Sequence, residues 1–125
     1  MTENKLGVVE SRFADIIWNN EPLSTAKLVE LCAGELAWKR TTTYTVLKRL
    51  CERGIFQNIN STVTSRISRD DFYSNVSELF VEENFSGSLP AFIAAFTKNK
   101  RLSEDEIDQI RNLIEDHALR ASREA

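Results

Sequence analysis

The part of the chain that decides its fold is residues 38–54, which read WKRTTTYTVLKRLCERG. Each residue of a helix advances about 100° around the axis, so this stretch has two sides of different composition. One side is apolar and holds Thr43, Leu47, Leu50 and Cys51. The other side is polar and holds Thr41, Thr45 and Lys48, with Thr42 and Arg49 along one edge and Tyr44 along the other. The stretch predicts a helix that packs on a core with one face and presents the other.

The polar side is unusual because it is rich in threonine, a β-branched residue that forms helices weakly. Threonine hydroxyls hydrogen-bond phosphate oxygens and base edges, the threonine methyl packs on thymine methyls, and lysine and arginine bind phosphates. We therefore expect this helix to contact DNA through a set of neighbouring residues: Lys39, Arg40, Thr41, Thr42, Tyr44, Thr45, Lys48 and Arg49. The alternative is an ordinary surface helix that happens to carry several threonines.

Charge is distributed unevenly along the 125 residues. The whole chain has a formal net charge of −3, yet residues 39–69 contain seven basic residues and one acidic residue, a local charge of +6. From residue 70 onward, acidic residues outnumber basic ones. A basic block inside an acidic chain favours a localised surface for a polyanion.

Two further helices are predicted before this stretch. Residues 6–18 carry apolar side chains at helical spacing, and a second helix is expected to begin after Ser24 as its N-cap. Gly34 is expected to end that second helix, because glycine is a poor helix former. Gly54, at the end of the third helix, suits a left-handed C-terminal turn.

A β-hairpin is predicted after the third helix. Residues 55–59 and 62–67 are β-prone and are separated by Asn60-Ser61. Three helices followed by a hairpin form a winged helix, whose third helix enters the major groove and whose hairpin is the wing. We expect Arg66 to lie on the wing and the DNA-binding domain to span residues 1–68.

Residues 69–125 contain three further amphipathic segments. Ser68, Pro90 and the capping box Ser103–Glu106 mark the beginnings of their helices. Each segment has an apolar face that it cannot bury alone. We expect these faces to pair with those of a second chain, in a homodimer held together by Phe72, Val76, Leu79, Phe80, Phe92, Ile93, Phe96, Ile107, Ile110 and Ile114. The alternative is that the segments fold back on the winged helix.

The expected fold class is mainly α with a small β-hairpin, an N-terminal winged helix-turn-helix followed by a C-terminal helical dimerisation region. The composition also bears on where the protein is located and on the role of its cysteines. No apolar run is long enough to cross a bilayer and no signal peptide is recognisable, which favours a cytoplasmic protein without membrane insertion. Cys32 and Cys51 fall at apolar helical positions and are interpreted as small buried hydrophobes.

Catalysis is not expected. No Cys, His and Asp grouping has metal-ligand spacing, so neither a metal nor a cofactor is predicted. His117 has no nucleophile near it in the sequence, and no phosphate-binding loop or catalytic motif is present. The chain is therefore not expected to be an enzyme.

Several strings have counterparts in a known family. They are Glu10 with Ile16-Ile17-Trp18, then Trp38, Thr42 through Leu50, Arg53-Gly54-Ile55, and Leu102 through Ile107. By these strings, which together extend over nearly the whole chain, the sequence resembles the penicillinase-repressor family, the BlaI, MecI and CopY type of bacterial winged-helix repressor. The resemblance implies a homodimer that binds a pseudo-palindromic operator in double-stranded DNA and represses transcription. It also implies DNA contacts from Thr41, Thr42, Tyr44, Thr45 and Arg49.

The chain departs from the family pattern at three places. Antibiotic-responsive members are cleaved at an Asn-Phe bond where this chain has Ala95-Phe96. Family analogy also implies a membrane sensor protease as a partner of this protein. Copper-responsive members carry a C-terminal Cys-x-Cys pair, whereas this chain has no cysteine after Cys51. Residues 59–67 also lack an aromatic near their end.

The alternative function is a winged-helix protein-interaction module without DNA binding. Such a module need not combine Lys48, Arg49 and the threonine cluster.

Overall fold

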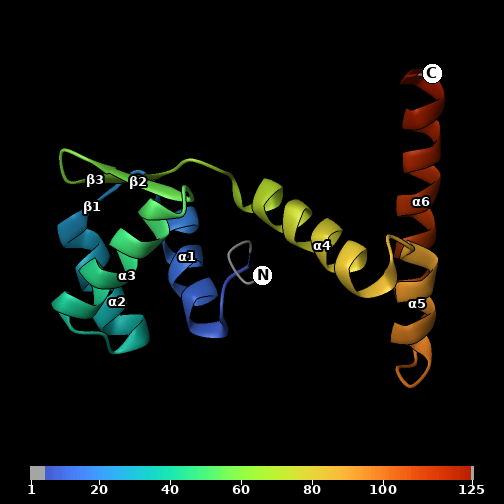
Figure 1. Ribbon diagram of the computed structural model, residues 1–125, viewed down its shortest axis with the longest axis horizontal. Coiled ribbons are helices and arrows are strands. Elements are labelled where there is room, and N and C mark those ends of the chain that lie inside the picture. Colours follow the sequence, from blue (N-terminus) through green and yellow to red (C-terminus); the bar gives the residue numbers. More distant parts are fainter. Residues whose placement is uncertain (1–4, 125) are drawn as a thin grey trace. The chain divides into compact units, whose positions relative to one another are not determined.

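The computed structural model describes residues 5–124. The elements follow one another as α1 (Val8–Asn20), β1 (Leu23–Ser24), α2 (Thr25–Leu36), α3 (Arg40–Glu52), β2 (Phe56–Ile59), β3 (Thr62–Ser65), α4 (Arg69–Phe85), α5 (Leu89–Thr97) and α6 (Glu104–Glu124) (Figure 1). The mainly helical fold with a small antiparallel sheet confirms the predicted fold class. Contacts divide the chain into two compact units, the first ending at Phe80 and the second beginning at Val81.

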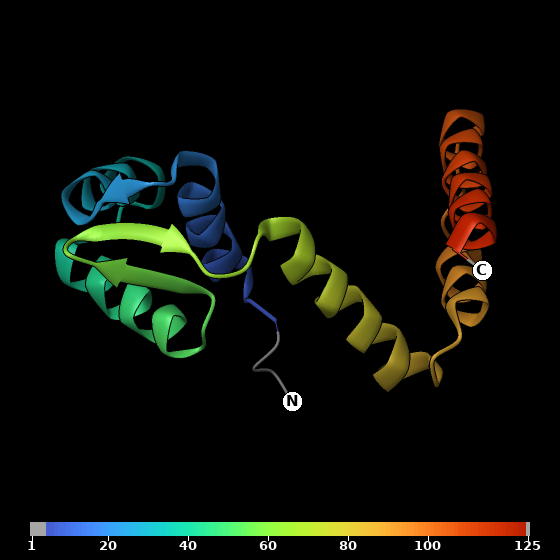
Figure 2. The same cartoon turned by 90° about the horizontal axis from the view of Figure 1, so that it is seen from above.

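The first unit is a winged helix. Strands β2 and β3 form the predicted hairpin, in which Ile59 pairs with Thr62. Between them Asn60 and Ser61 have φ values of 51° and 63°, the left-handed pair that a tight two-residue hairpin turn requires. Strand β1 was not predicted; it has only two residues, pairs with β3 and makes the strand order β1-β3-β2 (Figure 2).

The core of this unit lies between the three helices and the sheet. Its largest fully buried side chains come from every layer and include Phe13, Ile17, Leu28, Leu50, Phe56 and Val63. Glu21, at the end of α1, ties the hairpin down, because its carboxylate accepts hydrogen bonds of 2.8 Å from the backbone N–H and the hydroxyl of Ser65. The wing is thereby held against the first helix.

Helix α2 does not end at Gly34, as the sequence predicted. It continues to Leu36, and Ala37 ends it in a left-handed conformation (φ 56°), with its neighbour Trp38 donating a backbone hydrogen bond to Cys32. A glycine inside a helix costs about 1 kcal/mol relative to alanine, which the burial of Leu28 on the same helix outweighs. The ring of Trp38 then stacks on Phe13 at 5.4 Å, which sets the start of α3.

The first turns of α4 belong to the winged-helix unit. The indole nitrogen of Trp18 donates to the carbonyl of Ile67, and its ring lies 5.7 Å from that of Phe72. Arg69 forms an ion pair of 2.8 Å with Asp15 on α1. The contacts therefore carry the first unit beyond residue 68, the expected domain boundary. Phe72 was expected at a dimer interface, but the structure places it in this core at 6% exposure, with Val76 packed beside it.

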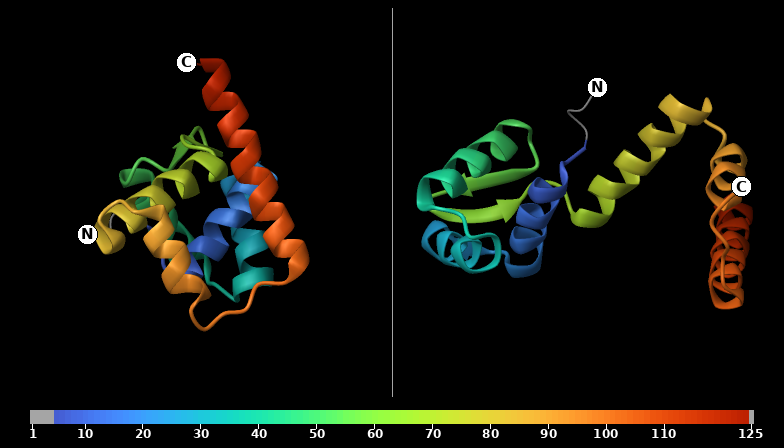
Figure 3. Two further views of the ribbon diagram at one scale, coloured as in Figure 1. Left: turned by 90° about the vertical axis from the view of Figure 1, so that its right-hand side faces the viewer. Right: turned by 90° about the horizontal axis from the view of Figure 1, so that it is seen from below.

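The second unit contains α5 and α6, which run in opposite directions from a short loop (Figures 1 and 3). Helix α6 begins at the predicted cap, since the hydroxyl of Ser103 accepts from the N–H of Glu106. Helix α5 begins at Leu89, one residue before the predicted Pro90, and its N-cap is Ser88, which was not predicted and whose hydroxyl accepts from the N–H of Ala91. Large apolar side chains remain exposed on both: Ile93, Phe96, Ile107, Ile110, Leu113, Ile114 and Leu119. Within residues 5–124, no helix is long and apolar enough to cross a membrane.

We expect Phe72→Ala to lower the free energy of unfolding by about 3 kcal/mol, because it removes a buried ring and leaves a cavity beneath Trp18. Urea denaturation followed by tryptophan fluorescence measures this. Ile59→Ala, on a wing side chain that is 57% exposed, serves as the control and should change stability by less than about 0.5 kcal/mol. Equal effects of both substitutions would contradict the core position of Phe72.

Candidate nucleic-acid interface

Helix α3 buries one face and exposes the other. Its buried side chains are Thr43, Val46, Leu47 and Leu50, with Cys51 partly covered. All of these residues were predicted to lie on the apolar side except Val46, which is buried beside that side of the helix. Thr41, Thr45 and Lys48 are exposed on the opposite face, as predicted from the periodicity. The helix cannot turn these residues inward without exposing its apolar side.

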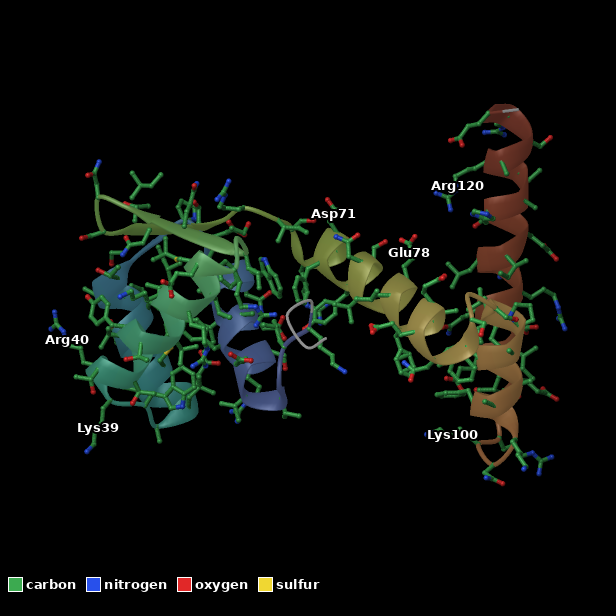
Figure 4. The ribbon with its side chains drawn as sticks, viewed as in Figure 1. Lys39, Arg40, Asp71, Glu78, Lys100 and Arg120 are labelled. Atoms are coloured by element: carbon green, nitrogen blue, oxygen red, sulfur yellow. The ribbon has the colours of Figure 1, made fainter. Side chains whose placement is uncertain are left out.

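The beginning of α3 is cationic and open to solvent. Lys39 is the N-cap residue, and no side chain caps the first turn. Lys39 and Arg40 both point away from the unit (Figure 4). The free N–H groups and the helix dipole make the start of a helix favourable for anions, so two cations placed there strengthen attraction for a phosphate.

The threonines of α3 are not equivalent. The hydroxyl of Thr45 donates to the carbonyl of Thr41 at 2.9 Å, and that of the buried Thr43 donates to the carbonyl of Lys39 at 3.3 Å. Thr45 therefore offers an outside partner its methyl group and a hydroxyl oxygen that can only accept. Thr42 is exposed at the edge of the same face.

Tyr44 and Arg40 form a pair on the other edge of α3. The guanidinium carbon of Arg40 lies 5.5 Å from the centre of the Tyr44 ring, within cation–π range. Tyr44 is half-buried, whereas Arg40 is exposed. The ring thus supports an arginine at the first turn of the helix.

Arg49 is held by a residue that the sequence analysis did not connect with it. Its Nε and Nη2 atoms donate to the Oε2 atom of Glu10 on α1, at 3.1 and 2.9 Å. The Oε1 atom of Glu10 accepts from the N–H of Gly7 and completes the capping box of α1. Partial burial raises the pKa of Glu10, but the hydrogen bonds from Gly7 and Arg49 outweigh it and hold that pKa below its usual value.

The wing carries its cation near its base. Arg66 follows β3 and is exposed, and its backbone N–H donates to the carbonyl of Ile55 at 2.8 Å. The tip of the wing is uncharged and exposed, and includes Asn58, Ile59, Asn60 and Ser61. Arg53, at the end of α3, donates to the carbonyl of Lys5 at 2.8 Å. The exposed side chains of α3 and of the wing thus belong to the same unit. Most of the positively charged side chains among them are on α3.

The thiols fit a structural role. Burial raises the pKa of the Cys32 thiol to about 11 and raises that of Cys51 as well, so neither is a reactive thiolate at neutral pH. In the described part of the chain, no group of three or more His, Cys, Asp or Glu side chains is arranged to hold a metal ion.

The lowered pKa of Glu10 predicts an acid-sensitive contribution to stability. A carboxyl whose folded pKa is depressed stabilises the protein above its unfolded pKa, near 4.5, and loses that contribution as the pH falls through the folded pKa. We therefore expect Glu10→Gln to flatten the pH dependence of unfolding below about pH 4.5. Urea denaturation from about pH 7 down to about pH 3 tests this. Parallel curves for the variant and the wild type would contradict the ion pair with Arg49.

Known proteins resemble this chain over most of its length. The family model described as Penicillinase repressor matches residues 6–116. The penicillinase repressor of Bacillus licheniformis is 24% identical over 109 residues, which are 84% of this chain and 85% of that protein. The methicillin resistance regulatory protein MecI of Staphylococcus aureus strain Mu50 is 23% identical over 114 residues, 88% of this chain and 93% of that protein. The crystal structure of the transcriptional regulator SlyA matches with 22% identity and a TM-score of 0.42, and the match covers 98% of this chain and 81% of the SlyA chain. Since the family model covers most of the sequence, this chain belongs to the penicillinase-repressor family.

Proposed function

We propose that this protein is a transcriptional repressor that binds a pseudo-palindromic operator as a homodimer. The observation that carries the proposal is the exposed face of α3, where threonines and cations gather on a helix whose opposite face is buried. Its relatives are named as repressors and as a resistance regulator, which supports the same function. No cofactor is part of the proposal.

In this proposal α3 lies in the major groove with its first turns toward the bases. Thr41, Thr42 and Thr45 read base edges, Thr45 through its methyl or as an acceptor, because its hydroxyl proton is already used. Phosphates are bound by the cations and by the aromatic beside them: Lys39, Arg40, Tyr44, Lys48 and Arg49. Arg66 reaches the backbone from the wing.

The dimer is proposed to form through apolar side chains that one chain leaves exposed. On α5 and α6 they surround an apolar hollow lined by Ile93, Leu102, Ile107, Ile110 and Ile114. Further proposed contacts are Leu79, Phe80, Phe92 and Phe96. A two-fold dimer would present two copies of α3 to half-sites about 34 Å apart, one turn of the DNA helix.

The direct test is an anisotropy titration against DNA from immediately upstream of the gene for this protein, with a scrambled duplex as the control. We expect tight binding that prefers the native duplex. If each subunit makes about four phosphate contacts, the log–log salt slope should be roughly −7. Equal, weak binding to both duplexes at every salt concentration would contradict the repressor function and favour a protein-interaction module.

Two substitutions on α3 should separate base reading from phosphate binding. We expect Thr42→Ala to reduce the preference for the native duplex, whereas Lys48→Ala should weaken binding to native and scrambled duplexes alike and make the salt slope shallower by about 1 per subunit. The same titrations measure both effects. If Thr42→Ala lowered the affinity for both duplexes equally, Thr42 would not be a residue that reads bases.

The dimer is tested by Ile110→Asp, which places a charge among the exposed apolar residues of α6. We expect this variant to sediment with the mass of one chain in analytical ultracentrifugation, while the wild type sediments as two, because an unpaired carboxylate is costly to bury. Lys100→Ala, in the exposed loop before α6, is the control and should remain dimeric. A monomeric wild type would contradict the proposed assembly.

A further inference from the structure

The contact between Glu10 and Arg49 joins two elements with different roles. Glu10 lies in the first turn of α1, and Arg49 lies 39 residues later on α3. Both hydrogen bonds end on one carboxylate oxygen, Oε2, so they occupy two of the five N–H groups of the guanidinium. Three N–H groups of Arg49 stay available to another acceptor.

The carboxylate is itself fixed in place. Its second oxygen accepts from the N–H of Gly7 at 3.2 Å, which ties it to the start of α1. The side chain of Glu10 is 24% exposed, whereas that of Arg49 is 52% exposed. Arg49 is therefore the more solvent-accessible member of the pair.

A second guanidinium lies near the Glu10 carboxylate. Arg53 is close enough to lower the pKa of Glu10 electrostatically, and Arg53 also donates to the carbonyl of Lys5. The Glu10 carboxylate is therefore acted on by two guanidinium groups, those of Arg49 and Arg53.

We propose that Glu10 is a positioning residue for DNA binding, holding the Arg49 guanidinium at the junction of α1 and α3 so that its free N–H groups meet a DNA phosphate. The inference rests on the proposed repressor function. An unsupported arginine loses side-chain freedom when it binds, and this loss weakens the complex. Glu10 restricts Arg49 before the DNA arrives, so less freedom is lost on binding.

The experiment is a double-mutant cycle on DNA affinity with Glu10→Gln, Arg49→Ala and the double variant. Glutamine keeps an oxygen for the N–H of Gly7 and so preserves the capping box, while it removes the charge that holds Arg49. Asp15→Asn is the matched control, because it removes a carboxylate from another ion pair of α1, the one with Arg69 on α4. Affinities and salt slopes are measured on the native upstream duplex, and thermal melts verify folding.

We expect Glu10→Gln to weaken binding by about threefold to tenfold and Asp15→Asn to leave it unchanged. In the Arg49→Ala background, Glu10→Gln should change the affinity by less than about twofold, because its effect passes through Arg49. Arg49→Ala should make the salt slope shallower by about 0.9 per subunit.

Three results would overturn the inference. Tighter binding by Glu10→Gln would mean that the carboxylate repels DNA or withholds Arg49 from it. Unchanged affinity with a lower melting temperature would leave Glu10 a purely structural helix cap. Equal effects of Glu10→Gln with and without Arg49 would show that the two residues act independently. If the wild type does not bind the duplex, the repressor function fails and this inference fails with it, whereas normal wild-type binding confines any failure to Glu10.

Discussion

The burial of one face of α3 is the constraint on which the rest of the structure depends. Val46, Leu47 and Leu50 pack into the core of the winged helix, and each buried side chain of this kind contributes about 1.5–3 kcal/mol. Rotating the helix would lose that contribution, so its threonines and cations must face outward. The surface proposed to read DNA is thus a direct consequence of packing, and its side chains need no further element to expose them.

Helix α1 contacts α3, the start of α4 and the base of the wing. Along its length and at its C-cap, four side chains reach different parts of the unit: Glu10 holds Arg49, Asp15 holds Arg69, Trp18 donates to the carbonyl of Ile67, and Glu21 accepts from Ser65. Helix α3, the start of α4 and the base of the wing are therefore all in contact with α1 or its C-cap residue. Because the first turns of α4 are part of this packing, the start of α4 is held in place within the winged-helix unit.

Periodicity and turn chemistry were enough to predict the local elements. The two faces of α3, the Asn60-Ser61 turn and the caps at Ser24 and Ser103 all depend on residues close together in sequence. Features set by distant residues were missed. Strand β1 is two residues long and forms only because it pairs with β3. Helix α2 continues through Gly34 because tertiary packing stabilises it. Phe72 was predicted at a dimer interface because its spacing in the sequence does not reveal its contact with Trp18. For the candidate site, the exposed face of α3 was predictable, but the partner of Arg49 was not.

The exposed face of α3 is proposed to meet DNA. Chemical-shift mapping tests this proposal most directly: the ¹⁵N-labelled protein is titrated with the native upstream duplex and the amide signals are followed residue by residue. We expect the largest changes on Lys39 through Arg49, with smaller ones around Arg66. Changes concentrated on α5 and α6, with α3 unaffected, would contradict the proposal.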